Sequence, residues 1–263
     1  MKKYLYIYKS ELMSTLQYFL DIVFKLLSYI IHIFIFMNLW DYIYDNPAEL
    51  INGYSKNQMI WYIIITEIIW AATDGRRYCR KISDDVRSGN IAYLINKPYS
   101  YIAYAISSHL GETTIKTLIT LAAGIIMGGV MLGEFPKLSL IGIILSFISM
   151  LLAVVINSLL ITFIGLISFI IEDSNPIYWL YSKMILMFGV VFPIEFFPGV
   201  LKHIISFSPI YVTCYGPAKL FVDFNFQSAI EIFIAQIVYL GIALAMCYGL
   251  YAKGVKRLNV TGG

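Results

Sequence analysis

Residues 74–100 read DGRRYCRKISDDVRSGNIAYLINKPYS and form a concentrated polar stretch in a chain that is otherwise strongly apolar. Three aspartates stand against six basic residues, Arg76, Arg77, Arg80, Lys81, Arg87 and Lys97. A charged side chain at the centre of a bilayer costs about 2.5–3.5 kcal/mol, so we expect this segment to lie in water between two membrane spans. Because it is the main soluble surface, we also expect a partner subunit to bind here.

The composition of the whole chain indicates a polytopic α-helical membrane protein, with residues 1–263 as one transmembrane domain. The chain is 59% hydrophobic and 13% charged, and its mean hydropathy is +0.76, whereas soluble domains carry about 25% charged residues. The net charge of +3 is too small to favour a nucleic-acid partner. The three cysteines and three histidines have no spacing typical of a disulfide framework or a metal site.

Apolar runs on either side of the loop predict six spans: Phe19–Ile43, Met59–Thr73, Ile102–Leu132, Leu138–Ile171, Ile177–Phe192 and Ala229–Tyr251. About 20 residues cross a bilayer, so the second and fifth runs are marginal, and the third and fourth must tilt or project beyond it. A further apolar region, Gly199–Phe226, is interrupted by Pro209 and Pro217, and neither piece is long enough to span.

Basic residues predict the orientation. With the N-terminus inside, the cytoplasmic side collects the six basic residues of the loop together with Lys2, Lys3, Lys9, Lys253, Lys256 and Arg257. The outer side keeps only Lys56, Lys137, Lys202 and Lys219. The positive-inside rule therefore places both termini in the cytoplasm. This orientation requires residues 193–227 to be re-entrant on the outer face, where irregular backbone must be buried in protein or line a wet cavity.

Residues 1–17 have helical periodicity. Leu5, Tyr8, Leu12 and Leu16 share one face, and Lys3, Ser10, Ser14 and Gln17 share the opposite face. A basic amphipathic helix before a span typically lies in the headgroup layer. The alternative is a cytoplasmic extension of the first span.

Within the loop, the sequence predicts a short helix that begins at Ser83. Ser83 is a suitable N-cap, Asp84 and Asp85 would lie in the first turn, and Gly89 suits the left-handed residue after the helix. So short a helix is not stable alone, which favours docking into a partner's groove. We expect the contact to be made by Ser83, Asp84, Asp85, Val86, Arg87, Ser88, Gly89 and Asn90. The alternative is a solvated basic loop that only fixes the topology.

Polar residues inside the predicted spans are candidates for a substrate path. Glu67 lies in WYIIITEIIW, and its side chain should face the bundle, a partner subunit or a wet path. Glu112 with Lys116, and Asp21 with Lys25, are four residues apart and can pair. Asn157 can hydrogen-bond across helices, and Gly124 with Gly128 permits close approach. The alternative is that these are structural groups at helix interfaces.

The sequence FPIEFFPG at 192–199 predicts a lid at the outer boundary. A proline ends the fifth span, and bulky apolar groups surround it; the candidate gate residues are Phe192, Pro193, Glu195, Phe196, Phe197 and Pro198. An ordinary interfacial aromatic belt is the alternative.

The loop and the span after it resemble the permease subunits of bacterial type-2 ABC exporters of the six-span group. The matching positions are Ile82, Asp85, Val86, Arg87, Ser88, Gly89, Asn90, Ile91, Ala92, Leu94, Lys97 and Pro98. The resemblance implies that the loop is a coupling helix seated in a cleft of an ATPase subunit, and that the outer segment helps to close the exit. It also implies a bacterial plasma-membrane protein that pairs with a second permease, a heterodimer more often than a homodimer.

No phosphate-binding G-x-x-x-x-G-K-[ST] motif and no ATPase signature occurs in the chain, so ATP and Mg are expected on a separate ATPase subunit. We expect no enzymatic activity, no catalytic residue and no cofactor in this chain. The sequence thus favours a subunit that exports a hydrophobic or amphipathic substrate such as a drug, lipid or peptide. The alternative is an ion-coupled carrier or channel that uses Glu67, Glu112 and Lys116; inverted repeats, which would support it, are not evident.

Overall fold

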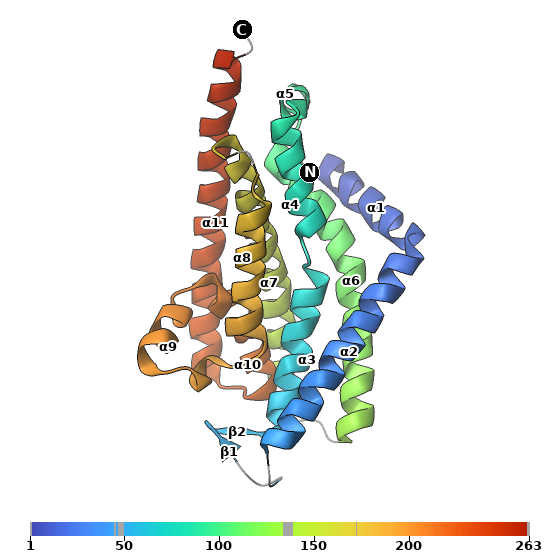
Figure 1. Ribbon diagram of the computed structural model, residues 1–263, viewed down its shortest axis with the longest axis vertical. Coiled ribbons are helices and arrows are strands. Elements are labelled where there is room, and N and C mark those ends of the chain that lie inside the picture. Colours follow the sequence, from blue (N-terminus) through green and yellow to red (C-terminus); the bar gives the residue numbers. More distant parts are fainter. Residues whose placement is uncertain (1, 45, 47–49, 134–138, 172, 262–263) are drawn as a thin grey trace.

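The computed structural model describes residues 2–44, 46, 50–133, 139–171 and 173–261, in which helices are joined by turns and a β-hairpin (Figure 1). The first part of the chain forms α1 (Lys2–Gln17), α2 (Phe19–Ile43), β1 (Leu50–Ile51), β2 (Tyr54–Ser55), α3 (Lys56–Ala72), α4 (Arg76–Arg87), α5 (Asn90–Ile95) and α6 (Tyr101–Leu132). The second part forms α7 (Leu140–Leu166), η1 (Ile167–Phe169), α8 (Asn175–Ile185), η2 (Leu186–Val190), η3 (Ile194–Phe196), α9 (Gly199–Ser206), η4 (Tyr211–Tyr215), α10 (Gly216–Val222) and α11 (Phe226–Thr261).

Four of these helices are long and apolar enough to cross a membrane: Phe19–Ile43, Tyr101–Leu132, Leu140–Phe169 and Phe226–Lys256. The chain is therefore a polytopic helical membrane protein, as its composition predicts. Leu138, where the fourth predicted span begins, and Lys137, which is predicted on the outer side, lie outside the described residues. The count of six spans stays a prediction.

The path of the chain places its two ends at the same end of the molecule. From α1, helix α2 runs towards the hairpin, α3 returns, α6 descends, α7 returns, α8 descends and α11 returns (Figure 1). The ends of the chain thus lie at the same end of the molecule as α4 and α5, and the hairpin, α9 and α10 lie at the other (Figure 1). We refer to these as the α4–α5 end and the hairpin end.

Helix α3 is the core of the bundle. Its N-terminus is fixed by a capping box in which Gln58 N donates to Ser55 Oγ at 3.3 Å and Ser55 N donates to Gln58 Oε1 at 3.0 Å. Nearly every residue from Met59 to Ile69 is buried, because α2, α6 and α10 pack around the helix. Its 17 residues measure about 26 Å, so the predicted marginal span is a short helix enclosed by protein.

The hairpin before α3 is not predicted by the pattern of apolar runs. Leu50 pairs with Ser55 and Ile51 with Tyr54, and the turn residues Asn52 and Gly53 have φ of 51° and 86°. Two left-handed residues in a two-residue turn are typical of type I′, for which Asn-Gly is the preferred sequence. The signal was present in the sequence as Asn52-Gly53.

Helix α1 lies across α6 and makes extensive contact with it. A Cβ built on Gly111 would meet the Tyr8 carbonyl oxygen at 2.5 Å, so the two backbones touch at this glycine. Tyr8 and Leu12 are half-buried, whereas Leu5 and Leu16, predicted on the same face, are exposed. The predicted apolar face is therefore divided between protein contact and the outer surface, and its position in the headgroup layer stays a prediction.

The segment between α8 and α11 is helical over more of its length than the prolines suggest. Pro209 begins a helical stretch and does not break one, and Pro217 lies inside that stretch, at the start of α10. The wider π-helical turn η4 directly precedes Pro217. Proline cannot donate a backbone hydrogen bond and clashes with the carbonyl four residues back, and a π turn is one way in which a helix accommodates such a defect.

Candidate functional site

The helix of the polar loop is longer than predicted and begins earlier. Helix α4 begins at Arg76 after the N-cap Gly75 and has 12 residues, so Ser83 lies inside it and is not its N-cap. Asp84 and Asp85 consequently lie near the C-terminus of α4 and not in its first turn. The missed signal is the apolar spacing of Tyr78, Cys79, Ile82 and Val86, all buried, which extends the helical face towards the N-terminus.

Buried hydroxyl groups join α4 to the helix behind it. Tyr78 Oη and Thr162 Oγ1 of α7 share a hydrogen bond of 2.6 Å, and Ser168 Oγ donates to Ser83 Oγ at 2.6 Å. A Cβ built on Gly165 of α7 would lie 2.8 Å from Ile82 Cβ, so the helices approach closely. Helix α4 is therefore packed along its apolar face against α7.

Gly89 forms the corner between α4 and α5. Its φ of 73° confirms the predicted left-handed residue after the helix. Asp85 braces the corner, because Asn90 Nδ2 donates to Asp85 Oδ1 at 2.8 Å and Tyr101 Oη donates to Asp85 Oδ2 at 3.0 Å. One carboxylate thus links the end of α4, the start of α5 and the start of α6.

The eight residues predicted to contact a partner divide into two groups. Ser83 and Val86 are buried and Asp85 is half-buried within the corner; the exposed members are Asp84, Arg87, Ser88, Gly89 and Asn90. Tyr93 on α5, which the prediction omitted, is 65% exposed and lies 4.7 Å from the Lys97 ammonium. The α4–α5 end therefore presents a polar ridge, Asp84 with 87–90 and Tyr93, on a rigid base.

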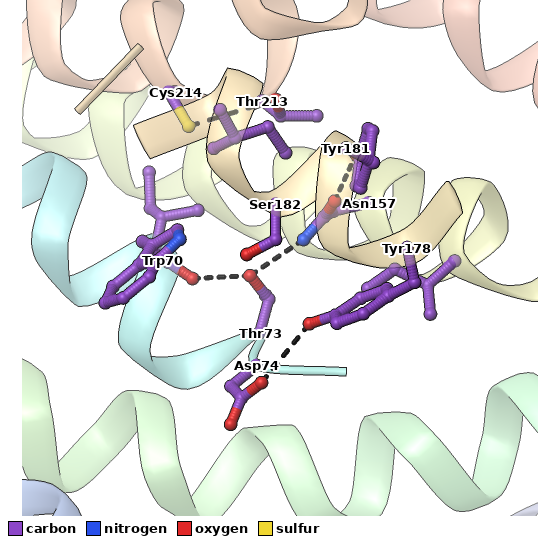
Figure 2. A pocket seen from close by; sticks show the side chains of 12 residues that line it. Trp70, Thr73, Asp74, Asn157, Tyr178, Tyr181, Ser182, Thr213 and Cys214 are labelled. Carbon is purple, nitrogen blue, oxygen red and sulfur yellow. Dashed lines mark hydrogen bonds between the residues drawn. The ribbon is translucent and has the colours of Figure 1, made fainter. Parts of the chain in front are cut away.

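Asn157 of α7 makes the cross-helix hydrogen bonds that the sequence predicts. Asn157 Nδ2 donates to Thr73 Oγ1 at 2.7 Å, and Tyr181 Oη of α8 donates to Asn157 Oδ1 at 2.5 Å (Figure 2). Beside it, Tyr178 Oη donates to Asp74 Oδ1 at 3.2 Å and accepts from Gly75 N at 3.0 Å. The network joins the α3–α4 junction to α7 and α8 around a cavity of about 30 Å³, enough for about one water molecule.

Glu67 faces the bundle, as one of the predicted alternatives requires. Its side chain has no exposed area, and neither carboxylate oxygen has a hydrogen-bond partner among the described residues. His32 of α2 lies beside it, with its Nδ1 3.8 Å from Glu67 Oε2. A buried carboxylate without a hydrogen bond is costly, which makes Glu67 a candidate for function rather than for stability.

Two predicted pairs of charged residues are confirmed. Lys116 Nζ donates to Glu112 Oε1 in α6, and Lys25 Nζ lies 3.5 Å from Asp21 Oδ2 in α2. Asp21 also accepts from Arg77 at 3.2 Å, which links α2 to the first turn of α4. The Gly124–Gly128 face is occupied within the chain, because built Cβ atoms would overlap Tyr29, Ile64 and the Trp61 ring.

The candidate gate residues lie at the hairpin end in an aromatic cluster with α2. The Trp40 ring packs edge-on at 5.9 Å from Phe192 and 5.6 Å from Phe196, and Phe197 packs at 5.6 Å from Phe188. Pro193 is buried and Pro198 is exposed. Glu195 accepts from Tyr215 Oη at 2.5 Å and lies 3.5 Å from Lys219 Nζ, so a polar group is paired inside the cluster.

Within the described part of the chain, no group of three or more His, Cys, Asp or Glu side chains is placed to hold a metal ion. His109, for example, stacks on Tyr78 at 4.1 Å and shares a hydrogen bond of 2.9 Å with Ser158.

The comparison with family models agrees with this architecture. The family described as ABC-2 family transporter protein matches residues 26–262. The chain belongs to this ABC-2 transporter family. It is therefore the membrane component, or permease, of an ABC transporter, and such permeases work with an ABC ATPase subunit. A search of curated proteins gives no match to the chain. The family match confirms the resemblance of the loop to type-2 ABC permeases. It assigns no role to individual residues.

Proposed function

We propose that this ABC-2 permease exports a hydrophobic or amphipathic substrate, using ATP and Mg bound by a separate ATPase subunit. In this proposal the chain has no catalytic role. Both termini and the α4–α5 end face the cytoplasm of a bacterium, six segments cross the plasma membrane, and residues 193–227 are re-entrant on the outer face. The common position of the chain ends and the basic α4 helix at one end of the molecule supports this orientation (Figure 1).

The polar ridge is the proposed ATPase contact, and the single observation that carries it is the braced corner at Gly89. Its exposed residues stand on a helix that is hydrogen-bonded to α7, and Asp85 fixes the angle between α4 and α5. A force applied to the ridge is therefore delivered to the bundle and not absorbed by a flexible loop. The exposed Asp84 and Arg87 supply charges for pairing.

The test is charge reversal at the ridge. Arg87→Glu should reduce the ATPase that copurifies with the permease by about tenfold or more, since removing one partner of a buried charge pair at an interface costs about 2–5 kcal/mol. Lys253→Glu is the matched control, because Lys253 is exposed in the last part of α11, and this helix ends at the α4–α5 end of the molecule (Figure 1). Asp85 is unsuitable for this purpose, because its replacement breaks the corner itself. Equal copurification with both variants would contradict the proposed contact.

Gly89→Val tests the transmission of movement. A β-branched residue strongly disfavours the φ of 73°, so the corner should open while the bundle stays folded. We expect a complex that still hydrolyses ATP but transports at least about tenfold less substrate per ATP. Normal transport by a correctly assembled Gly89→Val complex would count against a coupling role for the corner.

The assembly we propose contains two permeases and two ATPase subunits, with a related second permease more common than a second copy of this chain. The core of one bundle is filled by α3, so a single permease has too little surface to enclose a path for a bulky substrate. Because the Gly124–Gly128 face is occupied within the chain, the second permease must use another surface. Native mass spectrometry of the purified complex decides between the two, and a stable complex with one permease would overturn the proposal.

Glu67 and the gate residues are the proposed parts of the substrate path. If Glu67 lines that path, Glu67→Leu should abolish transport while the complex still assembles. Glu67→Gln keeps the shape of the side chain and separates loss of charge from loss of packing. Full transport by Glu67→Leu would make Glu67 a structural group and would remove it from the path.

A further inference from the structure

A cleft of about 390 Å³ opens between α2 and α8, beside the α3–α4 junction. Figure 1 shows α2 and α8 on either side of this junction, below the α4–α5 end. The cleft shares Trp70, Asp74, Tyr178 and Ser182 with the small cavity around Asn157. No step of the proposed function uses this cleft.

Four cationic side chains line the cleft: Lys25, Arg76, Arg77 and Lys183. Asp74 is the carboxylate among its lining residues, and it already accepts a hydrogen bond from Tyr178. Lys25 and Arg77 both contact Asp21, whereas Arg76 and Lys183 have no ion pair among the described residues. The cleft therefore has an excess of positive charge, and two of its cations are free to bind an anion.

The backbone at the cleft adds to this charge. Arg76 and Arg77 are the first two residues of α4, a helix of 12 residues with no acidic side chain in its first turn. The N-terminus of a helix carries partial positive charge, which favours an anionic ligand. One of its N–H groups is already paired, because Arg76 N donates to Asp74 Oδ1 at 3.4 Å. The hydroxyl-bearing residues Ser28 and Ser182 line the same cleft and can donate further hydrogen bonds.

The two helices that border the cleft also carry exposed apolar side chains. Trp179 lines the cleft and is 55% exposed. Exposed apolar side chains on these helices include Phe24, Leu27 and Ile31 of α2, Leu180 and Met184 of α8, and Met187 of η2, which continues α8. A ligand with an anionic head and an apolar tail matches this arrangement, since basic pockets between membrane helices bind anionic head groups.

We propose that the basic cleft, formed by Lys25, Arg76, Arg77 and Lys183, binds the phosphate or carboxylate head of an anionic amphiphile whose tail lies against α2 and α8. The head group comes from a bilayer lipid or from a free amphiphile. The idea that this ligand is the exported substrate rests on the proposed function. Binding of the ligand to the cleft does not depend on that function. The binding assay therefore contains no ATPase, so its result is independent of ATPase copurification.

The experiment measures ligand binding to the full purified chain by native mass spectrometry. The probes are phosphatidylglycerol, phosphatidylcholine with the same acyl chains, dodecyl phosphate and inorganic phosphate. Arg76→Gln/Lys183→Gln removes the two unpaired cations. Arg80→Gln/Lys253→Gln is the matched control, because it removes the same net charge at exposed positions outside the cleft. Thermal unfolding confirms that both variants are folded.

We expect the native chain to bind phosphatidylglycerol more tightly than phosphatidylcholine, and the cleft variant to bind it about tenfold or more weakly, because hydrogen bonds to charged groups are lost. Binding of dodecyl phosphate as well extends the site to free amphiphiles, and its absence assigns the site to bilayer lipid. The proposal is overturned if both variants lose binding equally, or if the native chain binds phosphatidylglycerol no more tightly than phosphatidylcholine. It is also overturned if inorganic phosphate binds as tightly as dodecyl phosphate.

Discussion

At the scale of single residues, small and polar side chains decide how closely the helices approach. Gly128 lies against the Trp61 ring, and a Cβ there would be 2.4 Å from a ring carbon. Gly128→Ala should destabilise the chain by about 1–3 kcal/mol or more through overpacking. Gly241→Ala is the control, since a Cβ there meets nothing within 4 Å and alanine favours the helix. Thermal unfolding in detergent should show the loss for Gly128→Ala only.

Asn157 tests the value of a buried polar group in the bundle. Asn157→Ala removes the hydrogen bonds to Thr73 and Tyr181 and should destabilise the folded chain by about 0.6–1.7 kcal/mol, the range for hydrogen bonds between membrane helices. Asn38→Ala is the control, because Asn38 is exposed and donates only within its own helix, to the Phe34 carbonyl. Equal unfolding temperatures for the two variants would show that the network contributes nothing.

At the scale of elements, one glycine holds α1 on α6. Gly111→Val brings a side chain against the Tyr8 carbonyl and the Leu12 amide, which are backbone atoms and cannot rotate away. The expected result is release of α1, with faster amide hydrogen exchange in residues 2–17 and unchanged exchange in α3. Gly249→Val in α11 is the control, because nothing lies within 4 Å of its built Cβ. Unchanged protection of α1 in Gly111→Val would contradict the packing.

At the scale of the whole molecule, the proposed orientation can be tested by cysteine labelling. A cysteine that replaces Lys202, exposed on α9, should react with an impermeant maleimide in intact cells, and one that replaces Lys256 should react only after permeabilisation. Labelling of position 256 in intact cells would contradict the proposed orientation and, with the N-terminus in the cytoplasm, would require an odd number of spans.

The native cysteines provide a low background for this labelling. Cys79, Cys214 and Cys247 are all buried, and burial raises the pKa of the Cys79 thiol to about 11. Since the thiolate is the reactive form, labelling of Cys79 should be slow near pH 7 and should increase only as the pH approaches 11. Rapid labelling of the unsubstituted chain at pH 7 would show that α4 leaves its packed position.

Most of the helical framework could be predicted from the sequence, because long apolar runs have few alternatives in lipid. The run Phe19–Ile43 is α2 residue for residue, and Ile102–Leu132 begins one residue inside α6. Pairs four residues apart, such as Glu112 with Lys116, were also predictable, since helix geometry alone brings them together. Gly89 was predictable because few residues accept a left-handed conformation.

Contacts between distant segments were decided only by the tertiary structure. Local capping signals placed the start of a helix at Ser83, but packing against α7 stabilises α4 from Arg76 onwards and buries Ser83. The Gly124–Gly128 face indicated close approach without naming a partner, and the partners are α2 and α3 of the same chain. The basic cleft brings Lys25, Arg76 and Lys183 together from three helices. Sequence patterns report each helix by itself, whereas the side chains that meet depend on how the helices pack.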